Sequence, residues 1–594
     1  MTLRAIGGLL VYNLFILGAG AGVLWGVRGW RWWTDFVRLV GVAYLLGLSA
    51  LMILMTSEIV LGIPIGAMTM VLSGAALVAL GVVVGRLRGF TTPGLRPPGW
   101  RFPGISLFAA LFLGGIVVYL ESLFRADRLS GVALEWDSWA FWMPKAKELY
   151  ASGRLEPEFL VLVQQLPSYP PGLATIQAGA FHAMGSADTV TLHVQYWFFA
   201  IGFAAAVIGL LAQRVRQAIL FPLLLAFLVA PSLLQWITTV YADLPLGYLV
   251  AVAALLVILW IEEKEPWQLA AATVLLSGAM VTKREGLLFA ACLLLAGLAA
   301  SFADRRQLWR RLVAAVLIAF VLVLPWRIWF TAHGLPGDGP DTGYGAAFSH
   351  LDRVWPALEL SVATLFEQEL WHFAPVLAAV AVVLALLAGE WRIPLYAGTF
   401  VIAATVASTW VFWSNLGLPL TQVDWASRRY AGTTVLVLAV LTPLLLQRAW
   451  STEPASGPAE SPGPDALFRP SRVAWVVVLL AALSHPGSML VGYAGSGLPG
   501  ARPSFPGAAG CVAAPVAGAN VRLVVGYADS YPEATAMRER ARAAGLGAAE
   551  ASQDGCGRLR VYVDDLPTTA AAQALAAEAQ AAGLRPTVEL DPDG

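Results

Sequence analysis

Residues 237–263 read ITTVYADLPLGYLVAVAALLVILWIEE, and this stretch decides the fold. After the acid Asp243, an uncharged apolar run occupies 245–261, and Glu262 and Glu263 close it. A helix needs about 20 largely apolar residues to cross the hydrocarbon core of a bilayer. Because backbone groups in lipid must be hydrogen-bonded within the segment, the run predicts a transmembrane helix.

Runs of this kind recur along the chain. Of its 594 residues, 58% are hydrophobic and 13% are charged, whereas soluble domains carry about 25% charged residues. The formal net charge of zero gives no indication of a nucleic-acid partner. We expect the first run to be a transmembrane helix rather than a signal peptide. The runs predict an all-α polytopic membrane bundle of about fourteen helices, at 5–27, 38–56, 58–84, 105–124, 191–212, 218–240, 245–261, 269–282, 286–303, 312–330, 373–389, 393–413, 431–447 and 473–493.

Loop arginines predict the orientation of this bundle, because short cytoplasmic loops are enriched in Lys and Arg. Only Arg4 argues against an outer N-terminus. Counting spans places the arginine-rich loops on one side, which we take as cytoplasmic: 28–38, 86–101, 214–216, 305–311 and 448–472. We expect a multi-pass protein of a bacterial cytoplasmic (inner) membrane, whose outer segments are 125–190, 331–372, 414–430 and everything after 493.

Composition divides the chain into four parts. Residues 1–104 hold extra N-terminal transmembrane helices, and 105–493 form the main transmembrane domain. Residues 494–520 are rich in Gly, Pro and Ala and predict a linker. Residues 521–594 are soluble in character, and their order of strand-like and helical runs is β-α-β-β-α-β. That order predicts a small extracytoplasmic α+β domain, a ferredoxin-like split unit.

The chain has three cysteines. Cys511 and Cys556 both fall in the part placed outside, where a disulfide between them could persist. Cys292 lies in an apolar run, and we expect it to be inert.

The first outer loop carries a pair of acids among aromatic residues. It reads LEWDSWAFWMPKAKELYASGRL at 134–155 and holds Glu135 and Asp137 between Trp136 and Trp139. The simpler interpretation is an amphipathic helix along the membrane interface with a solvated acid at its start. The functional interpretation is a carboxylate presented at the membrane edge.

Further polar motifs stand at the ends of spans. LPSYPPGLATIQA, at 166–178, places Tyr169, Pro170 and Pro171 before an apolar segment, and paired prolines keep Tyr169 out of the helix. Asp243 sits at one outer tip and Lys283-Arg284-Glu285 at the next, between short spans. Charges at such tips default to functional hypotheses, although Asp243–Lys283 or Glu285–Arg284 pairs could merely satisfy a hairpin.

VDWASRRYAGTT, at 423–434, puts Arg428 and Arg429 at the outer start of a span. Arginine suits bidentate contacts to phosphate. The alternative is a long side chain that reaches the interface for solvation only.

The ordered set of motifs over about 105–447 resembles the GT-C glycosyltransferases, and by pattern most of all the protein O-mannosyltransferases and the lipid A aminoarabinose transferases. The resemblance implies transfer of a sugar from a polyprenyl-phosphate donor to an acceptor outside the membrane, usually with inversion. It makes Asp137 the base, with Glu135 in support. Two departures stand out: Trp136 separates the two acids, and Ser168-Tyr169 replaces a Glu-Lys pair before the prolines.

The resemblance also implies roles for the remaining residues. Lys283, Arg284, Arg428 and Arg429 would bind the donor phosphate. The donor and acceptor pocket would be lined by Tyr169, Pro170, Pro171, Asp243, Glu285, Trp136 and Trp139. Glu135, Asp137 and Asp243 could hold a divalent cation such as Mg²⁺ or Mn²⁺ through their oxygens, although the sequence does not require one.

Residues 521–594 resemble the SPOR domain, which implies contact with peptidoglycan glycan strands. The main alternative for the whole chain is a transporter or flippase of a lipid-linked sugar or another envelope precursor. Transporters usually show internal repeats and polar groups near the midplane, whereas the charged motifs here sit at one edge. A third alternative is a non-catalytic envelope scaffold.

Overall fold

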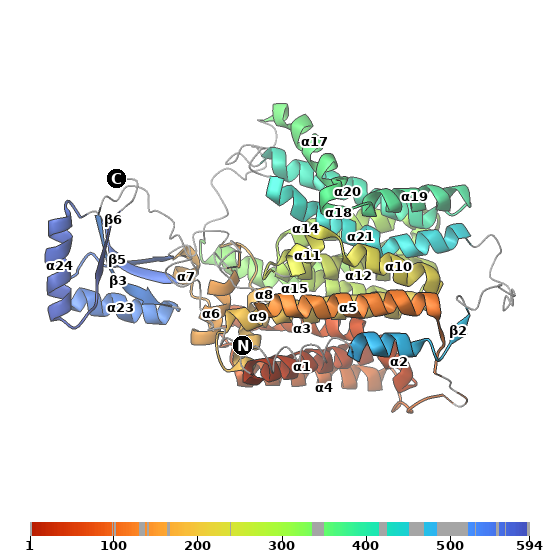
Figure 1. The fold of residues 1–594 in the computed structure, drawn as a ribbon, viewed down its shortest axis with the longest axis horizontal. Helices are drawn as coiled ribbons and strands as arrows, with labels where there is room; N and C mark the ends of the chain where they lie inside the picture. Colours follow the sequence, from red (N-terminus) through yellow and green to blue (C-terminus); the bar gives the residue numbers. More distant parts are fainter. Residues whose placement is uncertain are drawn as a thin grey trace.

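The computed structural model shows a helical bundle with a small α/β domain at one end (Figure 1). The residues that the structure describes are 3–97, 99, 102–129, 137–138, 142–162, 167–237, 239–335, 350–414, 424–450, 469–483, 521–528, 530–553, 558–564 and 566–590. Glu135, Trp136, Trp139, Cys511, Cys556 and the predicted linker at 494–520 lie outside this set.

The described residues include nine helices that are long and apolar enough to cross a membrane. They are α1 (Leu3–Val27), α3 (Val40–Val60), α4 (Ala67–Leu87), α5 (Leu107–Leu129), α9 (Thr189–Leu211), α12 (Asp243–Glu263), α15 (Arg305–Ala332), α20 (Arg392–Ser414) and α21 (Asp424–Trp450). A multi-pass membrane protein is therefore confirmed.

One predicted span, 218–240, is bent: α10 (Gln217–Leu228) and α11 (Pro231–Ile237) meet at 69°. The predicted span 373–389 is α19 (Ala374–Leu387), and it meets the helical segment Leu351–Trp371, which the sequence had placed in an outer loop, at 110°. Counting each bent pair as one span gives up to eleven within the described residues, so the predicted number of about fourteen is not confirmed. Two other predicted spans are short helices, α13 (Pro266–Thr282, 17 residues) and α14 (Glu285–Ala300, 16 residues).

The remaining elements are short and connect the long helices. They are α2 (Trp33–Arg38), α6 (Met143–Ser152), α7 (Pro157–Leu162), α8 (Gly172–Met184), α17 (Val354–Leu365), α18 (Gln368–Trp371), two single turns at Phe302–Asp304 and Leu351–Arg353, and the paired strands β1 (Ile105–Ser106) and β2 (Pro470–Ser471).

Helix α12, which begins at Asp243, lies at the centre of the bundle. All of its apolar window is buried, whereas only 22% of the window of α4 and 28% of that of α15 are buried. The outer helices expose large apolar side chains such as Leu72, Leu80, Leu317 and Val321. An apolar surface of this kind is what a helix presents to lipid.

The N-terminal helices are packed into the bundle through glycines. A Cβ atom on Gly20 of α1 would lie 1.7 Å from the carbonyl oxygen of Ala43 in α3, and one on Gly81 of α4 would lie 1.9 Å from that of Gly22. Small residues let membrane helices approach closely. Asn13 of α1 also exchanges hydrogen bonds of 2.8 and 2.9 Å with Gln195 of α9. The predicted extra helices thus share one core with the rest.

The arginine-rich loops lie together at one end of the bundle. Arg214 pairs with Glu263 at 2.5 Å, and Arg448 pairs with Glu262 at 3.1 Å. Lys264 and Arg392 each lie 3.1 Å from Asp304. Because these contacts join loops far apart in sequence, the loops predicted to share one side of the membrane do share one end.

The C-terminal domain has the predicted order of elements: β3 (Val521–Ala528), α23 (Tyr531–Ala543), β4 (Glu550–Gln553), β5 (Leu559–Val563), α24 (Thr569–Ala581) and β6 (Thr587–Leu590). Its antiparallel sheet has the strand order β4-β5-β3-β6. Strand residues alternate between the two faces. The face that packs against the helices carries apolar side chains such as Leu523, Val525 and Val561. Arg522 points to the other face and pairs with Asp564 at 2.9 Å.

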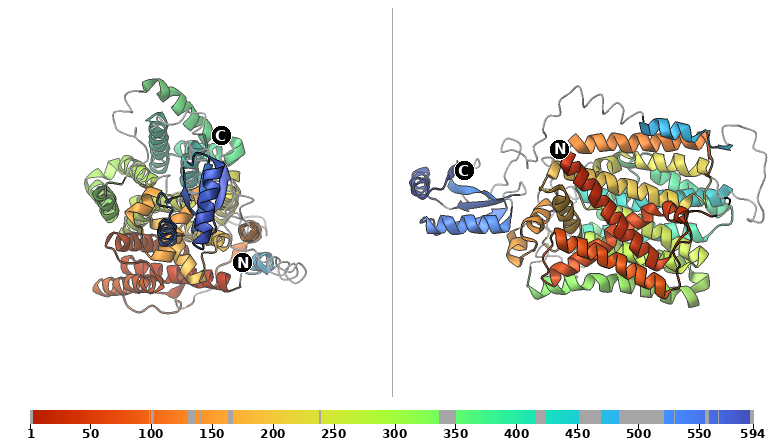
Figure 2. Two further views of the ribbon diagram at one scale, coloured as in Figure 1. Left: turned by 90° about the vertical axis from the view of Figure 1, so that its left-hand side faces the viewer. Right: turned by 90° about the horizontal axis from the view of Figure 1, so that it is seen from below.

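This domain sits at the end of the bundle opposite the arginine-rich loops, and a second view agrees (Figures 1 and 2). The backbone N–H of Tyr531 donates to Glu148 of α6 at 2.5 Å. The ring of Tyr531 also meets that of Phe159 in α7, with centroids 6.4 Å apart. The domain therefore contacts the bundle through the helices of the first outer loop.

The glycine packing of α1 gives a test with an internal control. Gly20→Ala should destabilise the protein by about 1–3 kcal/mol, because its Cβ would strike the backbone of α3. Gly18→Ala on the same helix meets nothing within 4 Å and should leave stability unchanged or raise it. Thermal unfolding of the detergent-purified chain measures both, and equal effects of the two variants would contradict the packing.

Candidate functional site

Four charged residues from four separate parts of the chain meet at the end of the bundle that carries the C-terminal domain. Asp137 lies between α5 and α6, Asp243 begins α12, Lys283 lies between α13 and α14, and Arg429 stands in the first turns of α21. Each belongs to a motif that the sequence singled out. The sequence placed these residues on one face of the membrane, and in the structure their side chains are in contact. We call them, together with Glu285, the acid–base cluster.

The contacts within the cluster form a chain of ion pairs. Arg429 bonds Asp137 through Nη2 and lies 3.7 Å from Asp243 through Nε. Lys283 Nζ lies 2.8 Å from Asp243 Oδ1 and 3.1 Å from Glu285 Oε1. The side chains of these residues are 2–10% exposed, so the pairs are largely shielded from solvent. Such charges must be paired, because an isolated buried charge is costly.

Tyr169 covers the basic side of the cluster. Its hydroxyl donates to Glu285 Oε1 at 3.0 Å, and its ring lies 5.6 Å from Lys283 Nζ and 5.2 Å from the guanidinium of Arg284. The ring of Trp142 stacks with that of Tyr169, with centroids 5.6 Å apart. The aromatic pair thus forms an apolar wall beside the cations.

The local sequence explains why Tyr169 reaches this position. Two prolines follow it, and helix α8 begins only at Gly172, as predicted. A Cβ atom on Gly172 would lie 2.5 Å from the carbonyl oxygen of Val281, near the end of α13. The absence of a side chain at Gly172 therefore lets the start of α8 contact the Lys283 tip.

Two buried carboxylate oxygens in the cluster have no hydrogen-bond donor among the residues that the structure describes: Asp243 Oδ2 and Glu285 Oε2. Buried polar atoms are nearly always hydrogen-bonded, and each exception needs an explanation. Both atoms could accept a hydrogen bond from a hydroxyl group of a ligand.

The pKa of the buried Asp137 carboxyl group is shifted by several neighbours. Burial raises the pKa of its carboxyl group above the ordinary 3.8, and Asp243 adds to the rise. Arg429 and Lys283 oppose it. Perturbed carboxyl groups of this kind cluster at functional sites.

The other predicted site residues are placed differently. Arg428 points away from the cluster, with Nη2 3.9 Å from Glu367 Oε1 and a side chain 44% exposed. Arg284 contacts the face of Tyr169, and Pro170 and Pro171 are buried. Glu135, Trp136 and Trp139 lie outside the described residues.

For the segment after Asp137, the simpler interpretation was an amphipathic helix with a solvated acid at its start. The acid is not solvated, because Asp137 is 4% exposed, and Met143 to Leu149 of α6 are all buried. Lys145 donates to the carbonyl oxygen of Tyr169 at 3.3 Å. The local pattern could not show this burial, because α6 packs mainly against α8, a helix from another part of the chain. Tyr241, whose ring lies 4.8 Å from the guanidinium of Arg429, was also missed, although it stands two residues before Asp243.

The carboxylates described here do not fit a divalent cation. Asp137 and Asp243 already bond Arg429 and Lys283, whose fixed positive charges would repel a metal ion. No group of three His, Cys, Asp or Glu side chains suited to a metal occurs within the described residues. Glu135, the third predicted ligand, is not among them.

Comparison of the chain with protein-family models, with curated proteins and with solved structures gave no match. The resemblances to GT-C glycosyltransferases and to the SPOR domain therefore stay predictions.

The buried pair predicts strong coupling between Asp243 and Lys283. Lys283→Met alone should cost about 3–5 kcal/mol, because it removes the nearest cation from two buried carboxylates, Asp243 and Glu285. Adding Asp243→Asn should recover part of that loss, giving a coupling energy above about 1 kcal/mol. A double-mutant cycle of unfolding free energies measures this.

The exposed pair Lys264–Asp304 is the matched control, since its atoms lie 3.1 Å apart but both side chains are more than a third exposed. The same cycle there should give less than about 1 kcal/mol. Equal coupling in the two pairs would show that the first is not buried.

Proposed function

We propose that the chain is a membrane glycosyltransferase of GT-C type, which transfers a sugar from a polyprenyl-phosphate donor to an acceptor outside a bacterial inner membrane. One observation carries the proposal: a candidate base, Asp137, lies in the same buried cluster as the candidate phosphate ligands Lys283 and Arg429. Inverting sugar transfer needs these two kinds of group on one site.

The chemistry assigns a distinct task to each charge. An acceptor hydroxyl gives its proton to Asp137 while its oxygen attacks the anomeric carbon of the donor. The bond from that carbon to the lipid phosphate breaks, and the phosphate leaves with the bonding electrons. Lys283 and Arg429 stabilise the negative charge that grows on it.

The resting ion pair between Arg429 and Asp137 fits this sequence of events. In the pair, Arg429 lowers the pKa of Asp137 and weakens it as a base. A donor phosphate would compete for Arg429 and relieve that effect. The base would then gain strength when the donor is bound, which limits unproductive proton transfer.

Asp243 Oδ2 and Glu285 Oε2, which accept no hydrogen bond from the described residues, support a polyhydroxylated ligand. Sugar hydroxyls donate hydrogen bonds to carboxylates, and a site built around such donors discriminates against ligands that lack them. Tyr169 and Trp142 supply the adjacent aromatic wall.

For the C-terminal domain we infer a SPOR-like contact with peptidoglycan glycan. The support is its polar sheet face, where the half-buried Tyr527 donates to Glu589 at 2.8 Å and packs against the guanidinium of Arg558 at 4.2 Å. Aromatic rings beside charged hydrogen-bonding groups suit a saccharide.

Activity tests the base directly. Asp137→Asn should lower transfer by about 10²–10⁴-fold, because an amide cannot take the proton. Asp352→Asn, an exposed acid in the second outer loop, should have no effect. The assay incubates purified protein with polyprenyl-phosphate sugars and envelope acceptors and follows product formation. Full activity of Asp137→Asn would show that Asp137 is not the base. Translocation of the lipid-linked sugar without transfer would instead support the alternative that the protein is a transporter.

The pH dependence of transfer gives a second test. A base works only when deprotonated, so activity should fall as the pH drops through the raised pKa of Asp137. Arg429→Gln removes the opposing cation and should move this acidic limb to higher pH. The neighbouring Arg428→Gln should leave the limb in place, because Arg428 lies beside Glu367 instead. Identical shifts in the two variants would contradict the role of Arg429.

A further inference from the structure

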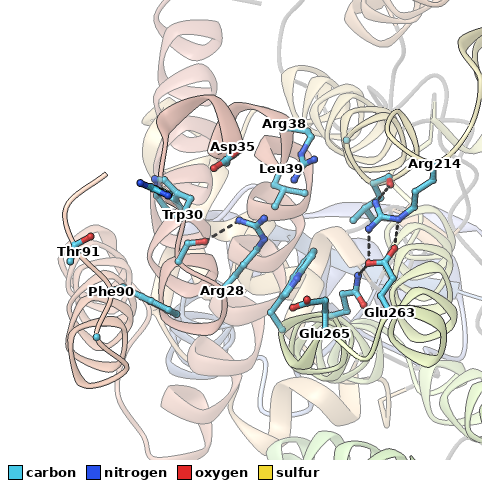
Figure 3. A pocket seen from close by; sticks show the side chains of 17 residues that line it. Arg28, Trp30, Asp35, Arg38, Leu39, Phe90, Thr91, Arg214, Glu263 and Glu265 are labelled. Carbon is cyan, nitrogen blue, oxygen red and sulfur yellow. Dashed lines mark hydrogen bonds and ion pairs between the residues drawn. The ribbon is translucent and has the colours of Figure 1, made fainter. Parts of the chain in front are cut away.

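A second polar site lies at the opposite end of the bundle, near the arginine-rich loops. It is a cavity of about 630 Å³ between the ends of several helices (Figure 3). Helix α12 connects the two ends, since Asp243 is its first residue and Glu263, in the cavity wall, is its last. At 1.5 Å per residue the two sites are about 30 Å apart.

Four arginines line the cavity: Arg28, Arg31, Arg38 and Arg214. Arg214 is paired with Glu263 through two contacts of 2.5 and 2.7 Å. Within the described part of the chain, no carboxylate lies in salt-bridge range of the other three. Arg28 donates only to the carbonyl oxygen of Gly29, at 3.0 Å, and packs over the ring of Trp267.

Three N–H donors on the cavity lining are buried and have no acceptor among the described residues: Arg28 Nε, Arg38 Nε and Trp30 Nε1. Figure 3 shows the guanidinium groups of Arg28 and Arg38 directed toward the same space, with the Arg214–Glu263 pair across from them. Buried N–H donors without a protein acceptor are available to hydrogen-bond an anionic ligand.

The pKa shifts of the cavity arginines also indicate that their positive charge is poorly compensated. Burial, followed by repulsion from Arg38, lowers the pKa of the Arg28 guanidinium, and Asp35 and Glu265 only partly offset this. Burial likewise lowers the pKa of Arg38, with Arg214 adding to the effect and Asp35 opposing it. The positive charge of the cavity is therefore incompletely neutralised by its own acids.

We propose that this cavity binds a phosphate-bearing anion, held by Arg28 and Arg38. Forked guanidinium groups match phosphate oxygens, and the volume lies within the usual range for small-ligand sites, about 300–1,000 Å³. Trp30 and Trp267 form an aromatic edge suited to an interfacial group. The anion could belong to a lipid headgroup or to a soluble phosphate. The site does not depend on the proposed transferase activity.

Such a ligand would join the ends of helices that are distant in sequence. Arg28 follows α1, Arg38 ends α2, Arg214 follows α9, and Trp267 lies in α13. A ligand that binds only the folded state stabilises it. Bound anion should therefore raise the unfolding temperature of the whole bundle.

The experiment uses the full chain in nanodiscs and measures thermal unfolding in two arms at fixed ionic strength. One arm adds inorganic phosphate to phosphatidylcholine nanodiscs, and the other replaces part of the phosphatidylcholine with phosphatidylglycerol. A rise in the first arm identifies soluble phosphate, and a rise only in the second identifies a lipid headgroup. No rise in either arm overturns the proposal.

Variants make the assignment specific. Arg28→Gln with Arg38→Gln should weaken anion binding at least about tenfold, as expected for lost charge-assisted hydrogen bonds. Asp35→Asn keeps both arginines and removes a competing carboxylate, so it should tighten binding even if the double variant folds poorly. Arg310→Gln with Arg311→Gln, exposed at the start of α15, is the matched control and should respond like the unaltered protein. An equal loss in this control, or unchanged binding in both the double variant and Asp35→Asn, overturns the proposal.

Discussion

The contact between Lys283 and Asp243 is the constraint on which the rest of the bundle end depends. Both side chains are 2% exposed, and neither charge could stay in such a place without the other. The pair fixes the first turn of α12 against the tip between α13 and α14. Arg429 and Glu285 then join it from either side, and Tyr169 closes over the cations.

Charge balance links this end of the bundle to its proposed chemistry. At rest the acids and bases neutralise each other, so the cluster is stable without a ligand, yet two carboxylate oxygens still lack donors. A donor phosphate would bind to the cations Lys283 and Arg429. The sugar hydroxyls would donate to the two carboxylate oxygens that lack a donor. At the opposite end of the bundle, the arginines around the cavity outnumber the acids, so positive charge is in excess there. Helix α12, wholly buried, holds the two ends at a fixed distance.

Local pattern was sufficient for much of the fold. Runs of apolar residues predicted the nine long helices, because a span has to satisfy its backbone internally and its length is set by the bilayer. The order of elements after residue 520 followed from period and turn residues. The count of spans was less secure, since the segment 218–240 bends by 69° between α10 and α11. Pro231 stands at this bend and begins α11, so the sequence does hold a cause of the bend that counting apolar runs overlooks.

The sequence by itself determined which residues are candidates: Asp137, Asp243, Lys283 and Arg429 stand out because charges beside apolar spans are costly. Only the tertiary structure decided how they combine, namely that Arg429 pairs with Asp137 while its neighbour Arg428 lies near Glu367. Adjacent residues on a helix point about 100° apart, and which one faces the core depends on packing from helices elsewhere in the chain. Burial of α6 was decided in the same way, by packing against α8 and by the hydrogen bond from Tyr531 of the C-terminal domain to Glu148.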